Sequence, residues 1–310
     1  MTWLILLVPA AILLALPAIL EAMRRPIDDR ARDYAPGRFA DLGQGRTHYQ
    51  WHGGKSTHTI VLVHGLSSPS WVFSGLIRGL VQAGYRVLSY DLYGRGYSDR
   101  AAGRQTLAFH TAQLGALLDD LGVDEPVTLM GYSMGGAIAA QFAADQSDRV
   151  ERLILLAPAG MEYRPGRLLK FAARTGPLGT WLWGLFGGAM LRRGAQRDAQ
   201  SPSVIADLPH RIAQELRHRG YLAAILSSER HTLSTPMEPV HREIAAMYIP
   251  TLAIWGEKDP VVPITAMGEL TRWNRQAHHE VVPGAGHALA YTNPQEVNAA
   301  VRTFLRDMPD

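Results

Sequence analysis

The sequence predicts an α/β fold: a mainly parallel, doubly wound sheet with a helical cap inserted after the sixth strand, plus one amino-terminal transmembrane helix. Apolar, β-branched runs alternate with helix-forming segments over residues 38–160 and again over 246–310. Residues 161–245 show helical patterns and no strand candidate. Residues 2–20 carry no charge. We therefore divide the chain into an anchor (1–23), a linker (24–37), a core (38–160 and 246–310) and a cap (161–245).

The overall composition is that of a packed globular protein. Hydrophobic residues make up 47% of the 310 residues and charged residues 19%. There is no cysteine, which excludes disulfides and thiolate metal sites. The net charge of +3 is too small and too scattered to indicate a nucleic-acid partner.

The uncharged segment 2–20 is long enough to cross a membrane once, at about 1.5 Å per helical residue. A cleaved signal peptide is the rival interpretation, but such peptides begin with basic residues, and only Met1, Thr2 and Trp3 precede the apolar run. Arg24 and Arg25 follow it. Because positive flanks stay in the cytoplasm, we expect an uncleaved anchor, contact with membrane lipid and a cytoplasmic domain; signal cleavage would instead give a periplasmic or secreted protein.

The core contains a series of predicted strands and helices. A first strand ends near residue 41 and pairs across a turn at 43–45 with a second strand. This second strand is predicted at 47–51. The later strands are predicted at 59–63, 86–90, 127–130, 152–156, 250–255 and 279–282. Helices are predicted at 68–83, 105–121, 137–144, from 263, and at 294–306.

The segment 127–136, VTLMGYSMGG, places a serine between a strand and a helix. It contains Gly131-Tyr132-Ser133-Met134-Gly135, the pattern G-x-S-x-G. In this turn the serine backbone is strained and the strand and helix approach too closely for side chains, which explains the glycines. The alternative is a glycine-rich turn with an exposed serine. The strand before and the helix after favour Ser133 as a nucleophile.

A nucleophilic serine needs a base and a carboxylate that orients the base. His287 follows the last strand, and Asp259 follows the strand before it. Each alone is a common loop or turn residue. Because the ends of parallel strands meet at one sheet edge, we expect both close to Ser133, with Glu257 as the second choice of acid. The backbone N–H groups of Leu66 and Met134 are the predicted oxyanion donors, and His64 is given no catalytic role.

These features together resemble the α/β-hydrolase superfamily. The resemblance rests on His64-Gly65, residues 91–98 (D-x-x-G-x-G-x-S), the segment 131–136, Asp259 and His287. It implies a serine hydrolase that needs no cofactor and no metal. The apolar amino terminus is similar to that of membrane-anchored members such as monoacylglycerol lipases.

Several branches of the family differ from this chain at informative positions. Haloalkane dehalogenases and epoxide hydrolases have Asp where this chain has Ser133. Carbon–carbon bond hydrolases have Asn and Trp where it has Tyr132 and Ala288. The sequence therefore favours a carboxylic ester hydrolase acting on apolar acyl chains. The open alternatives are a thioester hydrolase, a cofactor-free haloperoxidase-like enzyme and a binding protein with a degenerate site.

The uncharged segment 177–191 in the cap contains Trp181, Trp183 and Phe186 and is too short to span a bilayer. Three interpretations stay open: a cap helix buried on the core, a wall of an acyl-chain pocket, or a surface at the membrane interface. Nearby basic residues form a solvated face or a contact for anionic headgroups. They are Arg167, Lys170, Arg174, Arg192 and Arg193.

Overall fold

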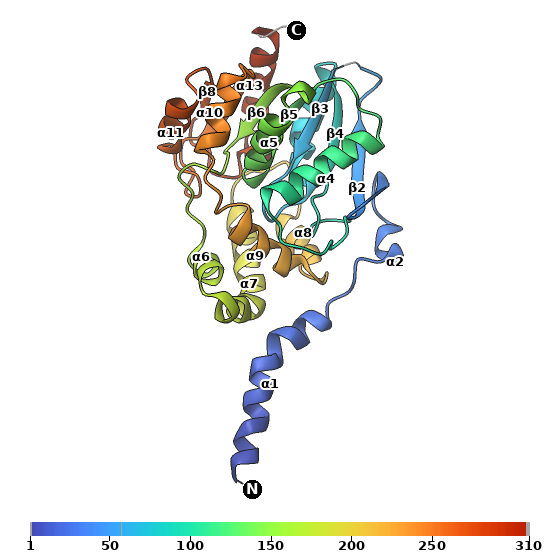
Figure 1. The fold of residues 1–310 in the computed structure, drawn as a ribbon, viewed down its shortest axis with the longest axis vertical. Helices are drawn as coiled ribbons and strands as arrows, with labels where there is room; N and C mark the ends of the chain where they lie inside the picture. Colours follow the sequence, from blue (N-terminus) through green and yellow to red (C-terminus); the bar gives the residue numbers. More distant parts are fainter. Residues whose placement is uncertain (1, 57, 308–310) are drawn as a thin grey trace.

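The computed structural model describes residues 2–56 and 58–307, except for the side chains of residues 2–6. It shows an eight-stranded sheet with helices on both faces and a group of helices at one end (Figure 1). The strands are β1 (Arg38–Leu42), β2 (Gly45–His52), β3 (Thr59–Val63), β4 (Arg86–Tyr90), β5 (Val127–Tyr132), β6 (Val150–Leu156), β7 (Thr251–Gly256) and β8 (His278–Val282). The predicted α/β class and the predicted strands are confirmed.

The sheet has the order β1-β2-β4-β3-β5-β6-β7-β8. The hairpin of β1 and β2 pairs antiparallel with β4, and all later pairs are parallel. The parallel part therefore has its carboxyl ends along one edge, where the loops after β3, β5, β7 and β8 meet. The sequence places Ser133, Asp259 and His287 in three of these loops.

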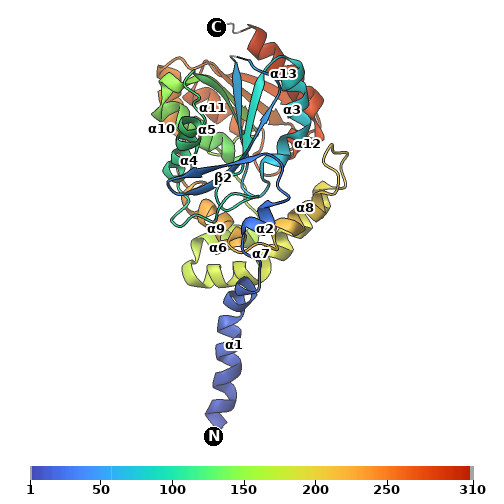
Figure 2. The same cartoon turned by 90° about the vertical axis from the view of Figure 1, so that its right-hand side faces the viewer.

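Helices cover both faces of the sheet, as the continuous apolar strands require. On one face lie α3 (Ser74–Gln82), α12 (Leu289–Thr292) and α13 (Pro294–Asp307); on the other lie α4 (Leu107–Asp120), α5 (Met134–Asp145) and α11 (Ala266–Trp273) (Figure 2). Ile60 and Leu62 belong to the first core, while Val61 and Val63 belong to the second. This alternation along β3 follows from the two-residue period of a strand.

Five helices lie between β6 and β7 in the sequence. They are α6 (Arg167–Arg174), α7 (Gly176–Asp198), α8 (Leu208–Glu215), α9 (Tyr221–His231) and α10 (Glu238–Ala246). Helices α6 to α9 pack on one another below the sheet (Figure 1), and we call residues 161–237 the cap. Helix α10 instead packs against α5 and α11, with Val240 and Ile244 buried in the second core. The predicted cap (161–245) includes α10, because the amphipathic pattern of this helix does not show which surface it covers.

Helix α1 (Thr2–Ala22) projects from the cap end of the molecule (Figure 1). Its carboxyl end is fixed to the cap: the Gly220 N–H donates to Glu21, and Arg25 exchanges backbone hydrogen bonds with Arg217 and Arg219. Across the residues described, none of the helices combines the length and the apolarity needed to cross a membrane. The predicted span over 2–20 thus has no support from the structure.

Candidate active site

Ser133 lies in a strained turn between β5 and α5. Its backbone has φ 54° and ψ −118°, a conformation that non-glycine residues rarely adopt. A Cβ added to Gly131 would lie 2.3 Å from the Gly135 carbonyl oxygen, and one added to Gly135 would lie 2.0 Å from that of Val63. These contacts explain why both flanking positions are glycine.

Ser133, His287 and Asp259 form one hydrogen-bonded chain. Ser133 Oγ lies 2.9 Å from His287 Nε2, and His287 Nδ1 lies 2.7 Å from Asp259 Oδ2. The other carboxylate oxygen of Asp259 accepts the N–H groups of Val261 and Val262, at 2.7 and 2.9 Å. These donors fix the carboxylate plane and, with it, the orientation of the imidazole ring. The structure therefore brings together the three side chains that the sequence singles out.

Glu257, the second choice of acid, has a different partner. Its carboxylate accepts the Gly284 N–H at 2.7 Å. The carboxylate that hydrogen-bonds to His287 belongs to Asp259. Glu257 instead ties the loop after β7 to the loop after β8.

The two predicted oxyanion donors lie beside the serine. Met134 is the first residue of α5, so its N–H has no acceptor within the helix. A Cβ on Gly65 would lie 3.3 Å from that of Ser133, which places the loop after β3, including Leu66, against the nucleophile. The amino end of α5 adds a partial positive charge at this point.

His64 holds this loop in place. Its Nδ1 lies 2.8 Å from the Gly65 carbonyl oxygen, and its Nε2 accepts the Leu92 N–H at 2.8 Å. Burial lowers the pKa of His64 to about 4, so the ring is neutral at physiological pH. This geometry gives His64 a positioning role.

The loop at 91–98 contacts the loop after β3. The buried Asp91 carboxylate accepts the Ser70 hydroxyl at 2.6 Å and lies 2.8 Å from His48 Nδ1. A Cβ on Gly96 would lie 2.1 Å from this carboxylate, which accounts for one glycine of the pattern. Buried Arg95 donates to the Leu66 carbonyl at 3.0 Å and to Ser228 of the cap at 2.8 Å. The loop thus links the cap to the loop that carries a predicted oxyanion donor.

A cavity of about 740 Å³ opens above Ser133 and His287. The polar residues that line it include Tyr132, Tyr163, Arg197, Asp198 and Tyr291. The Tyr132 hydroxyl donates to the His287 carbonyl at 3.0 Å, and the Tyr291 hydroxyl donates to Asp198 at 3.2 Å. Burial raises the pKa of Asp198, while the hydrogen bond from Tyr291 and the nearby His287 oppose this shift. In the sequence, only the position of Tyr132 next to Ser133 indicates a role at the site.

The uncharged cap segment 177–191 forms part of α7, and its three aromatic side chains have different surroundings. Trp183 is buried and donates to the Leu222 carbonyl at 2.8 Å. Phe186 is 52% exposed and lines a second cavity. Trp181 donates to the carbonyls of Leu13 and Leu14 in α1. Within the described part of the chain, no group of three or more His, Asp or Glu residues is placed to hold a metal ion.

Known proteins that resemble this chain share the fold but differ in chemistry. A hydrolase of 2-hydroxy-6-oxononadienedioate and 2-hydroxy-6-oxononatrienedioate from Paraburkholderia xenovorans is 29% identical, over 86% of this chain and 94% of that protein. Among solved structures, a bromoperoxidase from Bacillus anthracis covers 88% of this chain and 100% of its own, with 23% identity and a TM-score of 0.70. The match to a membrane phospholipase A covers 99% of this chain and 96% of that chain, with 21% identity and a TM-score of 0.70.

A family model establishes the relationship directly. The model described as the alpha/beta hydrolase fold matches residues 58–294, which include β3 to α12 and all the candidate site residues. With the parallel sheet and this match, the chain belongs to the alpha/beta-hydrolase family and is a hydrolase of that superfamily.

Proposed function

We propose that this protein is a serine hydrolase that cleaves carboxylic esters of apolar acyl chains. The observation that carries the proposal is the chain of hydrogen bonds from Asp259 through His287 to Ser133. It ends beside the Met134 N–H at the start of α5. A nucleophile, a base and an anion-stabilising group at one point are what acyl transfer requires.

In the proposed first half-reaction, Ser133 Oγ attacks the acyl carbon while His287 Nε2 takes the hydroxyl proton. The carbonyl oxygen becomes an oxyanion, which accepts hydrogen bonds from the Leu66 and Met134 N–H groups. The ester C–O bond then breaks, and His287 gives its proton to the departing alcohol. The Asp259 carboxylate stabilises the imidazolium that exists between these transfers.

The second half-reaction returns the enzyme to its starting state. Water attacks the acyl carbon of the acyl-enzyme and loses a proton to His287 Nε2. The bond to Ser133 Oγ breaks, and the same proton returns to that oxygen. A carboxylic acid leaves the site. Neither half-reaction includes a redox step or uses a cofactor.

Other reactions in the family share these three side chains, so sequence differences decide between them. The carbon–carbon bond hydrolases are disfavoured by Tyr132 and Ala288. Thioester hydrolysis and haloperoxidase-like activity are the remaining alternatives, and they serve as competing outcomes in the test.

The test begins with a fluorophosphonate probe, which forms a covalent bond only with an activated serine. The wild-type protein should be labelled at Ser133. A panel of p-nitrophenyl esters, monoacylglycerols and acyl-thioesters, with a bromination assay in peroxide and acetate, then identifies the reaction. Efficient ester hydrolysis supports the proposal. Labelling together with a higher kcat/KM for thioesters, or with bromination alone, would replace it with one of the alternatives.

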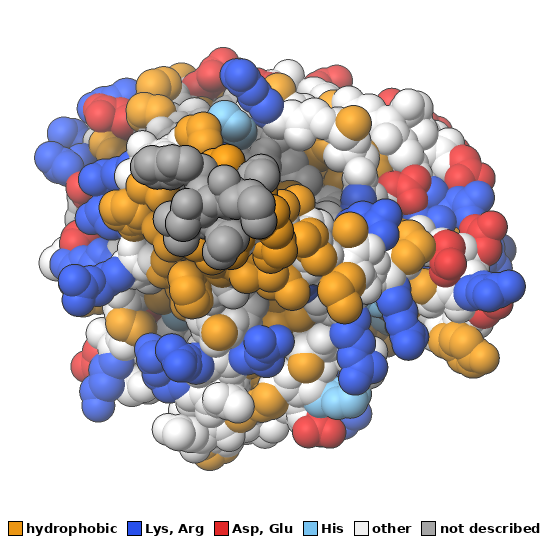
Figure 3. Space-filling model, turned by 90° about the horizontal axis from the view of Figure 1, so that it is seen from below, with side chains coloured by type: hydrophobic (Ala, Val, Ile, Leu, Met, Phe, Trp, Pro, Cys, Tyr) orange, Lys and Arg blue, Asp and Glu red, His pale blue; other side chains and the backbone are white. Residues whose placement is uncertain are grey.

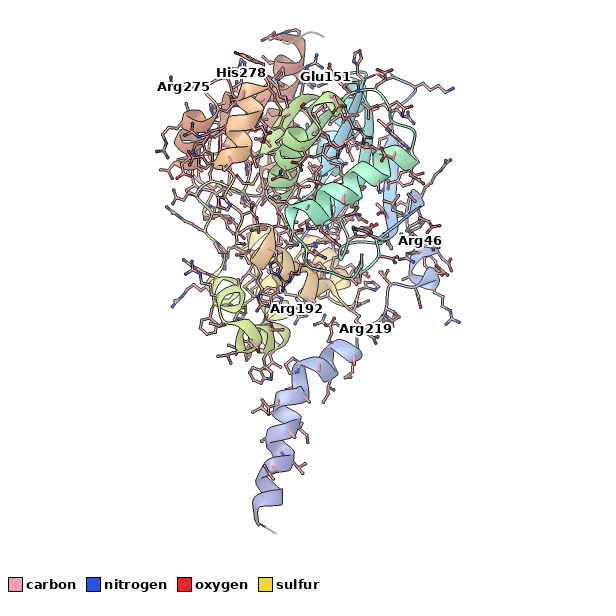
Figure 4. The ribbon with its side chains drawn as sticks, viewed as in Figure 1. Arg46, Glu151, Arg192, Arg219, Arg275 and His278 are labelled. Atoms are coloured by element: carbon pink, nitrogen blue, oxygen red, sulfur yellow. The ribbon has the colours of Figure 1, made fainter. Side chains whose placement is uncertain are left out.

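We also propose that α1 holds the protein at a membrane as a single-pass anchor, with the hydrolase domain on the cytoplasmic side. Support comes from apolar side chains exposed along its described part, which are Leu7, Val8, Ile12, Leu13, Leu14, Ile19 and Leu20. Seen from the α1 end, apolar side chains gather in the middle of the surface, with Lys and Arg around them (Figure 3). Arg192 on α7 and Arg219 near the end of α1 lie on this side (Figure 4). Such basic residues suit the anionic inner leaflet.

Cell fractionation tests this second proposal. The full chain should stay in the membrane during carbonate extraction. A variant that begins at Glu21 keeps the contacts of Glu21 and Arg25 with the cap, and it should be released and still hydrolyse short esters. Release of the full chain by carbonate would contradict the anchor. A mature protein starting after residue 20 in a periplasmic fraction would identify a signal peptide instead.

A further inference from the structure

A second cavity adjoins the candidate active site. It has a volume of about 760 Å³ and lies between α6, α7 and α8 of the cap. The two cavities share part of their lining, so they meet rather than lie on separate surfaces. The shared residues are Ser67, Ser68, Gly194, Arg197, Asp198 and Tyr291.

The inner lining of the second cavity is apolar. Leu208 and Ile212 of α8 are 3% and 4% exposed and form its buried wall. Leu168, Phe186, Met190 and Leu191 complete this lining. The side chains of Arg167, Arg193 and Arg197 at its rim are exposed, and the half-buried Asp198 carboxyl lies where it joins the first cavity. Such a cavity favours a long apolar group over a polar one.

Gly194 lies where the two cavities meet. It belongs to α7, lines both cavities, and a Cβ added to it would meet no atom within 4 Å. One turn further along the helix, Asp198 is tied to Tyr291 of the core, which fixes the other side of this junction. The missing side chain at position 194 therefore leaves an opening between the nucleophile and the apolar cavity.

From this arrangement we infer that the second cavity binds the acyl chain of the ester, which passes over Gly194 with its carbonyl carbon at Ser133. The inference rests on the proposed ester hydrolysis and adds the substrate class, namely esters of long acyl chains. Each methylene group that leaves water for this lining adds about 0.8 kcal/mol of binding free energy. Chains too short to cross Gly194 gain nothing from the second cavity.

The test places a side chain at the junction with Gly194→Leu. The measured quantity is the ratio of kcat/KM for p-nitrophenyl dodecanoate to that for p-nitrophenyl acetate. In the variant this ratio should fall at least about 50-fold, the effect of losing roughly three buried methylene groups. A ratio within about twofold of the wild-type value would overturn the inference.

Gly268→Leu is the matched control, because Gly268 is an exposed glycine of α11 outside both cavities with nothing within 4 Å of its Cβ position. Both substitutions replace a helical glycine with a better helix former, so neither is expected to unfold the protein. The control should keep the wild-type ratio.

A binding measurement separates this inference from the proposed function. Dansyl-labelled undecanoic acid should bind the wild type with a saturable rise in fluorescence, and at least about tenfold more weakly in Gly194→Leu. If no ester is hydrolysed but this difference is found, the proposed function fails and the cavity assignment stands. Equal binding by both proteins would overturn the assignment whatever the activity.

Discussion

His287 Nε2 lies 2.9 Å from Ser133 Oγ, although 154 positions separate the two residues in the sequence. The parallel sheet produces this contact, because β5 and β8 end at the same edge. Each residue is also held by contacts other than this one: Ser133 by the strained turn into α5, and His287 by Asp259 and by the Tyr132 hydroxyl. The base is thus positioned before any substrate binds, which lowers the reorganisation that catalysis requires.

Replacing Ser133 with alanine should abolish labelling by the fluorophosphonate probe and reduce kcat by roughly 10⁴- to 10⁶-fold, because only the oxyanion donors would remain. The fold should persist, since the substitution removes a single oxygen atom. Far-UV circular dichroism serves as the control for folding. Full labelling of this variant at another serine would show that the nucleophile is misassigned.

Asp259→Asn should lower kcat by roughly 10⁴-fold, because an amide cannot stabilise the imidazolium and can hold the wrong tautomer of His287. The carboxylate is buried and accepts two backbone N–H groups, so the loop should keep its shape. Glu257→Gln is the matched control: it keeps an acceptor for the Gly284 N–H and should retain kcat within about threefold. A larger loss of kcat in Glu257→Gln than in Asp259→Asn would show that Glu257 is the acid of the site.

The sequence predicted the strands and the nucleophile turn because both depend on local chemistry. Continuous β-branched runs such as Thr59–Val63 must be buried on both faces, and G-x-S-x-G reflects steric contacts within a few residues. Because the carboxyl ends of parallel strands lie along one edge of a sheet, the loops that follow them were expected to meet there. Asp259 and His287 could be selected because each directly follows a strand.

The cap could not be predicted to the same extent, because its contacts join segments that no periodicity connects. Nothing in the sequence around Gly194 or Asp198 shows that both lie beside the candidate active site. The pattern of α10 predicted a helix but not its place against α5 and α11. The hydrogen bond from Arg95 to Ser228 likewise depends on tertiary packing alone.

Gly135→Ala should destabilise the fold, because the new Cβ would lie 2.0 Å from the Val63 carbonyl oxygen and 2.6 Å from that of His64. Both atoms belong to the backbone and cannot rotate away. The free energy of unfolding, measured in urea, should fall by at least about 3 kcal/mol. Gly268→Ala, on an exposed helical face, should leave it unchanged or raise it by up to about 1 kcal/mol. Equal stability of the two variants would contradict the close approach of α5 to β3.

Glu229 of α9 has a buried carboxyl group that accepts the Tyr163 hydroxyl at 3.0 Å. Burial raises its pKa from 4.5 to about 7, and the hydrogen bond from Tyr163 only partly opposes this. A carboxyl group with a higher pKa in the folded chain binds more protons there than in the unfolded chain, so its contribution makes the fold less stable as the pH rises from 4.5 to 7. The full difference between these two pKa values corresponds to about 3 kcal/mol in the free energy of unfolding.

Glu229→Gln isolates this contribution, because the amide oxygen still accepts from Tyr163 but does not titrate. The free energy of unfolding is measured for both proteins at about pH 4 and about pH 8, on either side of that window. The wild type should lose stability relative to the variant between these two values, by up to about 3 kcal/mol, since the charged carboxylate must be buried only in the wild type. Parallel pH profiles for the two proteins would show that the Glu229 carboxyl reaches water in the folded state. Because Tyr163 lines the cavity above Ser133, the same titration should also move the pH dependence of KM, and Glu229→Gln should remove that component.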